Sequence, residues 1–195
     1  MTNNEVEEKA QEVLAKYLTK GNAHKVLLDI VAAEGIKFRK IVSANEKFVG
    51  ALTKANNGQL YIIVNSIENI GRKNFTIAHE LGHHFLEHPL QSNSFYCLND
   101  AIAEDGQAPS HEEHEANHFA SCLLMPEEKL RNAFLAMLAN SRKARINDFL
   151  EVKNDHTFSI WRGICADLTK RYGVSEAALR YRLLKLGMAS FHFNK

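Results

Sequence analysis

Apolar residues follow a helical period at the start of the chain. Over residues 5–19 they recur on one face, which predicts an amphipathic helix. The residues on this face are Val6, Ala10, Val13, Leu14 and Tyr17. Residues 23–34 repeat the pattern and are followed by Gly35, a residue that commonly ends a helix. We therefore expect two helices before the first change of period.

Short strand-like runs follow Gly35. Their apolar residues are Ile36, Phe38, Ile41, Phe48, Val49 and Leu52. Residues 59–65 form the strongest predicted strand, and the Asn56-Asn57-Gly58 segment before it is typical of a hairpin turn. The pattern predicts two or three antiparallel strands.

The helical period then returns over residues 74–88 and ends at Pro89. Residues 90–109 are acidic and small and are expected to form a loop, and a second helix of this region is expected over 111–125, before Pro126. Further helices are predicted over 127–139, 145–151, 158–172 and 175–187. The order of helices, a small antiparallel sheet and more helices predicts the α+β class.

The sign of the net charge changes near residue 126, where the predicted helix over 111–125 ends. Residues 1–126 hold 11 Lys and Arg against 16 Asp and Glu, a net −5, whereas residues 127–195 hold 13 against 7, a net +6. We expect a core over 1–126 and a helical part over 127–195 that packs on it as one structural unit. The basic part suits nucleic acid, an acidic partner or a solvated surface, and the solvated surface is favoured.

The composition narrows the class of protein. With 195 residues, 45% hydrophobic and 24% charged, the chain has the make-up of a globular domain, which excludes disordered, collagen-like and disulfide-stapled chains. No apolar run approaches the roughly 20 residues of a membrane helix. The polar, acidic first residues do not resemble a secretory signal, so a cytoplasmic location is expected. The three cysteines, Cys97, Cys122 and Cys165, are expected to be reduced thiols.

The chemistry concentrates in the segment His79-Glu80-Leu81-Gly82-His83. Histidines four residues apart lie on one helical face, so both imidazoles can reach one metal ion. Glu80 is rotated by about 100° from His79 and flanks the ion, where it can accept a proton from metal-bound water. This spacing predicts a zinc site with Glu80 as a general base.

The third ligand is expected on the next predicted helix. Helical projection places Glu112 and Glu113 on its buried face and Glu115 at the edge, while His114 and His118 point away. The period alone leaves Glu112 and Glu113 as alternatives.

Two structural alternatives apply to this helix. Ser110 and Glu113 fit a helix-capping box, which would give Glu113 a local role. His114 and His118 could hold a second metal, although solvated surface histidines are the simpler interpretation. Asn117 lies one turn after Glu113, where its amide could orient a ligand.

The sequence resembles the ImmA/IrrE family of zinc metallopeptidases. The matching segments are 72–83, which contains the HExxH residues, and 113–126, which begins Glu113-His-Glu-Ala-Asn117; the strand over 62–65 also fits. The resemblance is strong over about 1–126 and looser beyond. It implies a zincin-like core and zinc held by His79, His83 and the glutamate of an ExxxN pattern, which here is Glu113.

The resemblance also implies an activity. Members of this family cleave a helix-turn-helix transcriptional repressor or a similar regulator, so this chain is expected to be a cytoplasmic zinc endopeptidase with a protein substrate. The predicted strand over 59–65, if it lies at a sheet edge, could pair with an extended substrate. Tyr96, His111 and His114 are the candidates for stabilising the oxyanion.

The last two predicted helices are spaced as in a helix-turn-helix. One helix closes at Gly173, Ser175 caps the next, and Arg180, Arg182 and Lys185 decorate it. Three basic residues are few for DNA affinity, so we favour a packed helix pair with a core of Leu179, Leu183, Leu184 and Leu186. The alternative function is a regulatory protein that binds DNA or a transcription factor through these helices, with zinc but without peptidase activity.

Overall fold

The computed structural model describes the chain in two compact units, Met1–Leu124 and Met125–Lys195. The residues described are 1–17, 21–45, 47–90, 94–98, 110–140 and 148–192, and for 94–98 the description covers the backbone only. No described helix has both the length and the apolar character needed to cross a bilayer.

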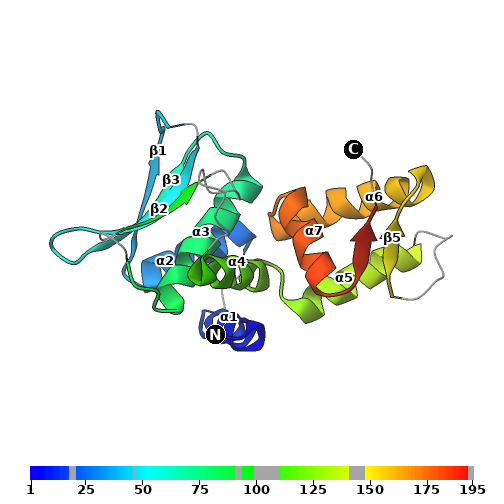
Figure 1. Cartoon of the computed structure of the whole chain (residues 1–195), viewed down its shortest axis with the longest axis horizontal. Helices are drawn as coiled ribbons and strands as arrows, with labels where there is room; N and C mark the ends of the chain where they lie inside the picture. Colours follow the sequence, from blue (N-terminus) through cyan, green and yellow to red (C-terminus); the bar gives the residue numbers. More distant parts are fainter. Residues whose placement is uncertain (18–20, 46, 91–93, 99–109, 141–147, 193–195) are drawn as a thin grey trace. The chain divides into compact units, whose positions relative to one another are not determined.

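The α+β class is confirmed, and the first unit has a zincin-like arrangement. Its helices are α1 (Asn3–Lys16), α2 (Ala23–Ala33), α3 (Ile70–Phe85) and α4 (His111–Leu124). Its strands are β1 (Lys37–Ile41), β2 (Phe48–Lys54), β3 (Leu60–Asn65) and β4 (Ser94–Leu98). Helix α3 lies between the sheet and α4, and α1 packs on α4 (Figure 1).

The sheet is mixed, which corrects the antiparallel sheet expected from the sequence. Its order is β1-β3-β2-β4, and β1 runs parallel to β3. The β2–β3 hairpin turns at Gly58 as predicted, with a φ of 84°. Because β1 covers one side of β3 and β2 the other, β3 is not an edge strand. The condition under which residues 59–65 could pair with an extended substrate is therefore not met.

Strand β4 lies inside the segment that was expected to be a loop. It pairs antiparallel with β2 and forms the edge of the described sheet. The rest of that segment, residues 91–93 and 99–109, lies outside the described residues.

The described residues of the second unit form three helices and a small parallel strand pair. The helices are α5 (Glu127–Asn140), α6 (Asp155–Tyr172) and α7 (Glu176–Lys185), and the strands are β5 (Leu150–Val152) and β6 (Ala189–Phe191). The helix predicted over 145–151 is wrong at its end, where β5 begins; residues 145–147 lie outside the described residues. As expected, α6 ends at a left-handed Gly173 and Ser175 caps α7.

Helix α7 keeps only part of the predicted apolar core and basic surface. Leu179 and Leu183 are fully buried, whereas Leu184 is 48% exposed, so its assignment to the core is wrong. Arg182 is also buried and donates from Nε to the Met125 carbonyl oxygen at 3.2 Å. Arg180 lies 4.5 Å over the ring of Phe191. Lys185 Nζ lies 5.6 Å over the ring of Tyr181, so all three basic residues have contacts within the unit.

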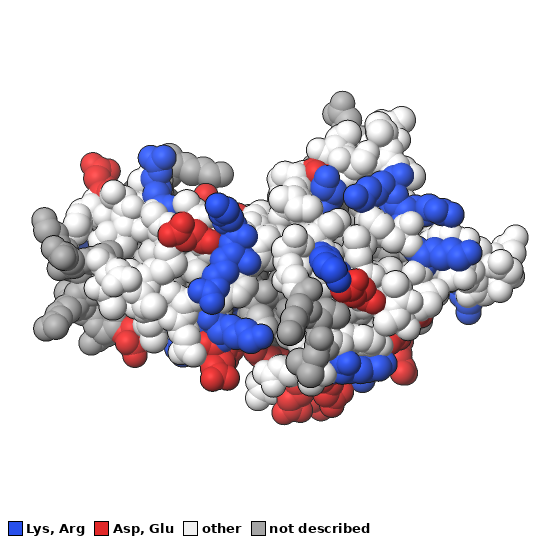
Figure 2. All heavy atoms as spheres, turned by 180° about the vertical axis from the view of Figure 1, so that it is seen from behind, with Lys and Arg blue, Asp and Glu red and all other residues white. Residues whose placement is uncertain are grey.

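Charged side chains are interspersed on the face drawn in Figure 2. Lys and Arg side chains form short groups with acidic and uncharged side chains between them. Ion pairs such as Arg131–Glu127 and Lys153–Glu151 connect the two signs in the second unit. This distribution is typical of a solvated surface.

Helix α3 is held closely on both sides by contacts at glycine. A methyl group on Gly82 would meet the Ala116 Cα at 3.0 Å and the Ala116 carbonyl oxygen at 3.1 Å, so α3 and α4 touch backbone to backbone. On the sheet side, a methyl group on Gly50 would collide with Thr76 of α3 and lie 2.9 Å from the Ile63 carbonyl oxygen. These approaches explain why α3 is buried along most of its length.

We expect Gly82→Ala to destabilise the protein by about 1–3 kcal/mol, the usual range for overpacking against atoms that cannot yield. Gly163→Ala is the matched control, because Gly163 also lies in a helix but no described atom comes within 4 Å of a methyl group there. The control should be neutral or stabilising by about 0.4–1 kcal/mol. Urea unfolding measures both, and equal stability of the two variants would contradict the close helix contact.

Candidate active site

Helix α3 brings two buried histidines together. His79 and His83 are 2% and 1% exposed, and their Nε2 atoms lie 3.0 Å apart. They occupy one face of α3, one helical turn apart, as their spacing predicted. The face turns toward α4, which packs on α3.

Helix α4 contributes the carboxylate of Glu113 to the same place. Its Oε2 lies 3.2 Å from His79 Nε2, and its Oε1 lies 3.3 Å from His83 Nε2. In a zinc tetrahedron with bonds of about 2.0–2.1 Å, ligand atoms lie about 3.4 Å apart. The three side chains could therefore hold one metal ion.

The other two carboxylates of α4 lie elsewhere. Glu115 is 9% exposed and faces His88, while Glu112 is at the start of the helix beside Ser110. The backbone N–H of Glu113 lies 3.3 Å from Ser110 Oγ, as a cap requires, but its side chain turns to the two histidines. The structure thus brings Glu113, and neither Glu112 nor Glu115, to the histidine pair.

Hydrogen bonds to the far ring nitrogens orient both histidines. His79 Nδ1 lies 3.0 Å from the Oδ1 of Asn117. An amide oxygen only accepts, so the neutral His79 ring carries its proton on Nδ1 and presents the Nε2 lone pair toward Glu113.

His83 is oriented by a chain that ends on Glu115. His83 Nδ1 lies 2.9 Å from His88 Nδ1, and His88 Nε2 lies 3.0 Å from Glu115 Oε2. The carboxylate accepts from His88 Nε2–H, so His88 Nδ1 accepts from His83 Nδ1–H. This leaves the His83 Nε2 lone pair directed at the shared space.

His88 was not predicted as a functional residue. It follows Glu87, which has a left-handed φ of 55°, and its N–H donates to the His83 carbonyl oxygen at 3.0 Å. This reversal of the chain at the end of α3 turns His88 back onto His83. The sequence feature that could have predicted this reversal is Pro89, because proline is common just beyond such a helix end.

Comparison with known proteins identifies the family. Residues 33–184 match Peptidase_M78, described as IrrE N-terminal-like domain. The chain belongs to this family. The ImmA/IrrE resemblance of the sequence is thereby confirmed, and membership supports a peptidase, and hence a hydrolase, role. None of the curated proteins compared with the chain matches it.

In this Peptidase_M78 protein, Glu80 is completely buried beside the histidine pair. Neither carboxylate oxygen forms a hydrogen bond of regular geometry among the described residues, although the backbone of Leu52 on β2 is close enough to favour the charged form. Burial raises the pKa of Glu80 to about 8 against the opposing effect of His79, and the charge of Glu113 adds to the increase. A dication among the three converging side chains would lower it through its own charge.

The three converging groups have different protonation tendencies. Burial would raise the pKa of Glu113, but the two imidazoles hold it well below its usual range. Burial also acts on the histidines: it lowers the pKa of His83, whereas at His79 the contacts with Glu113 and the charge of Glu80 outweigh it and raise the pKa. Glu113 is therefore ionised near neutral pH, as a metal ligand must be.

The donor set fits zinc. Two imidazole nitrogens and one carboxylate are a known ligand set of catalytic zinc sites, which keep a fourth position for water or substrate. Glu80 interacts electrostatically with both His79 and Glu113, and a cation held by these groups would offset the cost of burying its carboxylate.

The remaining predicted residues of α4 divide into two groups. His114 is exposed, as the projection predicted, but His118 is only 7% exposed, so its assignment to the outer face is wrong. The physical reason is that α4 is covered twice, by α3 on one side and by α1 on the other. Because His114 is exposed and His118 is buried, the two do not form the surface histidine pair that the helical period offered for a second metal.

The candidates for oxyanion stabilisation are not brought into the site by described contacts. His111 is largely exposed and lies 3.3 Å from Glu115 Oε2. His114 is exposed, and the side chain of Tyr96 lies outside the described residues.

We expect Glu113→Gln to weaken zinc binding at His79 and His83 by at least about tenfold, since even groups that only support ligands contribute that much. Glu112→Gln is the matched control, because it removes the same charge one residue away. Competition with a chromogenic chelator measures both affinities. A greater loss in Glu112→Gln would contradict the arrangement of α4.

His88→Ala is expected to weaken zinc binding by about 10–100-fold, because the His83 ring loses the partner that orients it. The exposed His114 provides the control His114→Ala, which should leave the affinity unchanged. The same chelator competition applies, with circular dichroism to verify the helices. Unchanged affinity in His88→Ala would remove His88 from the site.

Proposed function

We propose that the protein is a zinc-dependent endopeptidase, with zinc held by His79, His83 and Glu113 and with Glu80 as the general base. The observation that carries the proposal is the carboxylate of Glu80: it is fully buried, forms no hydrogen bond of regular geometry among the described residues, and interacts electrostatically with His79 and Glu113 of the converging metal-binding group. A purely structural zinc site closes with four protein ligands and has no use for such a group.

Zinc, when bound, would polarise a peptide carbonyl and increase the acidity of a water molecule. The chain's own residues supply the positioning. Asn117 and His88 hold the two imidazole rings with their Nε2 lone pairs toward one point. Glu113 adds a negative charge on the opposite side of that point. These groups are set before a substrate arrives, which is how electrostatic preorganisation lowers a barrier.

Glu80 moves the proton in this mechanism. Its carboxylate takes the proton of the attacking water at one Oε and later delivers it to the nitrogen of the leaving amine. The dry surroundings favour the protonated carboxyl, so the proton is easily held between the two steps. Because Glu80 is the direct neighbour of His79 on α3, it would carry the proton only a short distance from the water to the amine.

The proposed substrate is a helix-turn-helix transcriptional repressor or a similar regulator in the cytoplasm. The support is the family resemblance, and the reduced thiols of Cys122 and Cys165 suit that compartment. An extended substrate segment would add to the sheet beside β4, since β4 is the edge of the described sheet and pairs with β2, which packs on α3 at Gly50.

We assign the C-terminal helices to protein contacts rather than to DNA. The burial of Arg182 and the stacking of Arg180 on Phe191 reduce the cationic surface of α7 that phosphates could reach. The alternative of a DNA-binding regulator without peptidase activity therefore has less support.

Glu80→Gln tests the proposed function. The amide keeps the shape of the side chain but cannot accept a proton, so we expect normal folding and zinc content with cleavage slower by about 10²–10⁴-fold. The assay incubates wild-type or Glu80→Gln protein with any helix-turn-helix repressor encoded next to its gene and with a peptide library, and follows products by mass spectrometry.

Glu112→Gln serves again as the control and should cleave like the wild type. Equal cleavage by Glu80→Gln and the wild type would exclude Glu80 as the base. If zinc-loaded wild-type protein cleaves neither the repressor nor any library peptide, the peptidase proposal is contradicted.

A further inference from the structure

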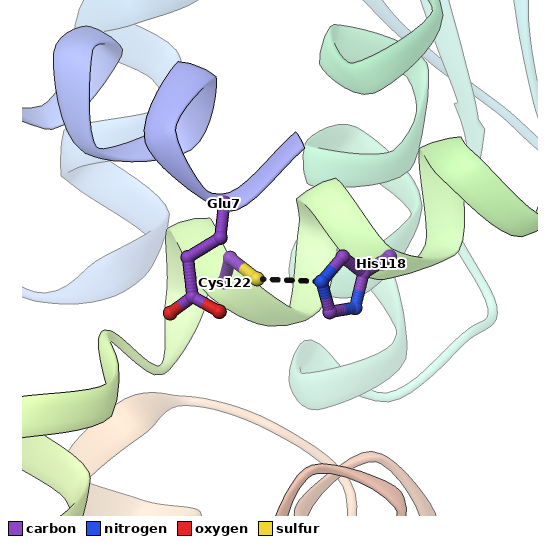
Figure 3. A group of neighbouring side chains, drawn as sticks. All are labelled: Glu7, His118 and Cys122. Atoms are coloured by element: carbon purple, nitrogen blue, oxygen red, sulfur yellow. Dashed lines mark hydrogen bonds between the residues drawn. The ribbon is translucent and has the colours of Figure 1, made fainter. Parts of the chain in front are cut away.

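A second group of metal-binding side chains lies between α1 and α4. It consists of Glu7 from α1 and His118 and Cys122 from α4, and it is drawn in Figure 3. Its carboxylate, imidazole and thiol donor atoms all lie within 4.8 Å of one another. Among the described residues, only this group and the His79–His83–Glu113 group bring three such donors together.

The spacing on α4 repeats that of the two histidines on α3. His118 and Cys122 are four residues apart and so share one helical face. Their Nε2 and Sγ atoms are 3.6 Å apart, and Figure 3 shows the two side chains turned toward each other. In a zinc tetrahedron with a Zn–S bond of about 2.3 Å and a Zn–N bond of about 2.0–2.1 Å, the same two atoms lie about 3.6 Å apart.

A backbone oxygen is also close to His118. Its Nε2 lies 3.2 Å from the carbonyl oxygen of Asn3, at the start of α1. A carbonyl oxygen can only accept a hydrogen bond, so in a metal-free protein one Nε2 must serve both this oxygen and the sulfur. A cation would satisfy the nitrogen, the sulfur and the oxygens at once, because all of them are electron-pair donors.

The surroundings fit a closed structural site rather than a catalytic one. His118 is 7% and Cys122 2% exposed, and Glu7 is partly buried on α1. A thiol, an imidazole and a carboxylate form a borderline-soft set, which suits zinc and not magnesium or calcium. The carbonyl oxygen of Asn3 could serve as the fourth protein ligand that closes such a site.

We propose that Glu7, His118 and Cys122 bind a second zinc ion that fastens α1 to the outer face of α4. The matched family region begins at residue 33, so Glu7 lies outside it, whereas His118 and Cys122 lie inside it. The site therefore joins the family core to a helix that precedes it. It is independent of the peptidase proposal, because it shares no residue with the first group.

Cobalt titration of the full chain tests the second site, because only this group contains a thiolate. Thiolate-bound Co²⁺ gives an intense near-ultraviolet charge-transfer band, which histidine and carboxylate ligands do not give. We expect metal-depleted wild-type protein to bind two Co²⁺ ions per chain and to show the band. The His79→Ala/His83→Ala double variant should bind one ion and keep the band.

Cys122→Ser should bind one ion and lose the band. Cys165→Ser is the control, because Cys165 is also buried but lies outside the site, and this variant should bind two ions and keep the band. Glu7→Gln should weaken the second ion by at least about tenfold, and Glu8→Gln, the exposed neighbour on the same helix, should not. Glu7→Gln changes a partly exposed side chain, so it decides the matter even if Cys122→Ser fails to fold. A band absent from the wild type, or unaffected by both Glu7→Gln and Cys122→Ser, would overturn the proposal.

Discussion

The contact between the backbones of α3 and α4 at Gly82 and Ala116 is the constraint on which the candidate site depends. Glu113 precedes Ala116 by less than one turn, so this approach brings its carboxylate within 3.3 Å of both histidines. Asn117 follows Ala116 and reaches the far side of His79 from the same helix. Helices separated by larger side chains would sit about 8–10 Å apart, and a glycine at the crossing allows the closer approach.

The sheet side of α3 imposes a complementary requirement. Gly50 on β2 lets the strand lie directly on Thr76, so α3 is enclosed between strand and helix and Glu80 loses all contact with solvent. Burial without a hydrogen-bond partner is normally unfavourable for a carboxylate, by several kcal/mol when it is charged. The packing that encloses α3 is thus also what raises the pKa of Glu80, a perturbation typical of functional sites.

Much of this site could be predicted from sequence, because the helical period fixes which residues share a face. His79 and His83 lie together for that reason, and the ExxxN pattern separated Glu113 from Glu112 where the period alone could not. The failures have identifiable causes. His88 depends on the left-handed Glu87, a conformation that few non-glycine residues adopt. His118 was assigned to solvent because projection assumes one buried face, whereas α4 has two. The parallel pairing of β1 with β3 is a long-range choice that local patterns do not encode.

Helix α4 carries donors on two faces, and this has a thermodynamic consequence. Glu113 and Asn117 face α3, while His118 and Cys122 face α1. Because α4 is in contact with both α3 and α1, a change at one face can be transmitted to the other through a single rigid element. Any coupling between the two proposed metal sites would be reciprocal: each ion would change the affinity for the other by the same factor.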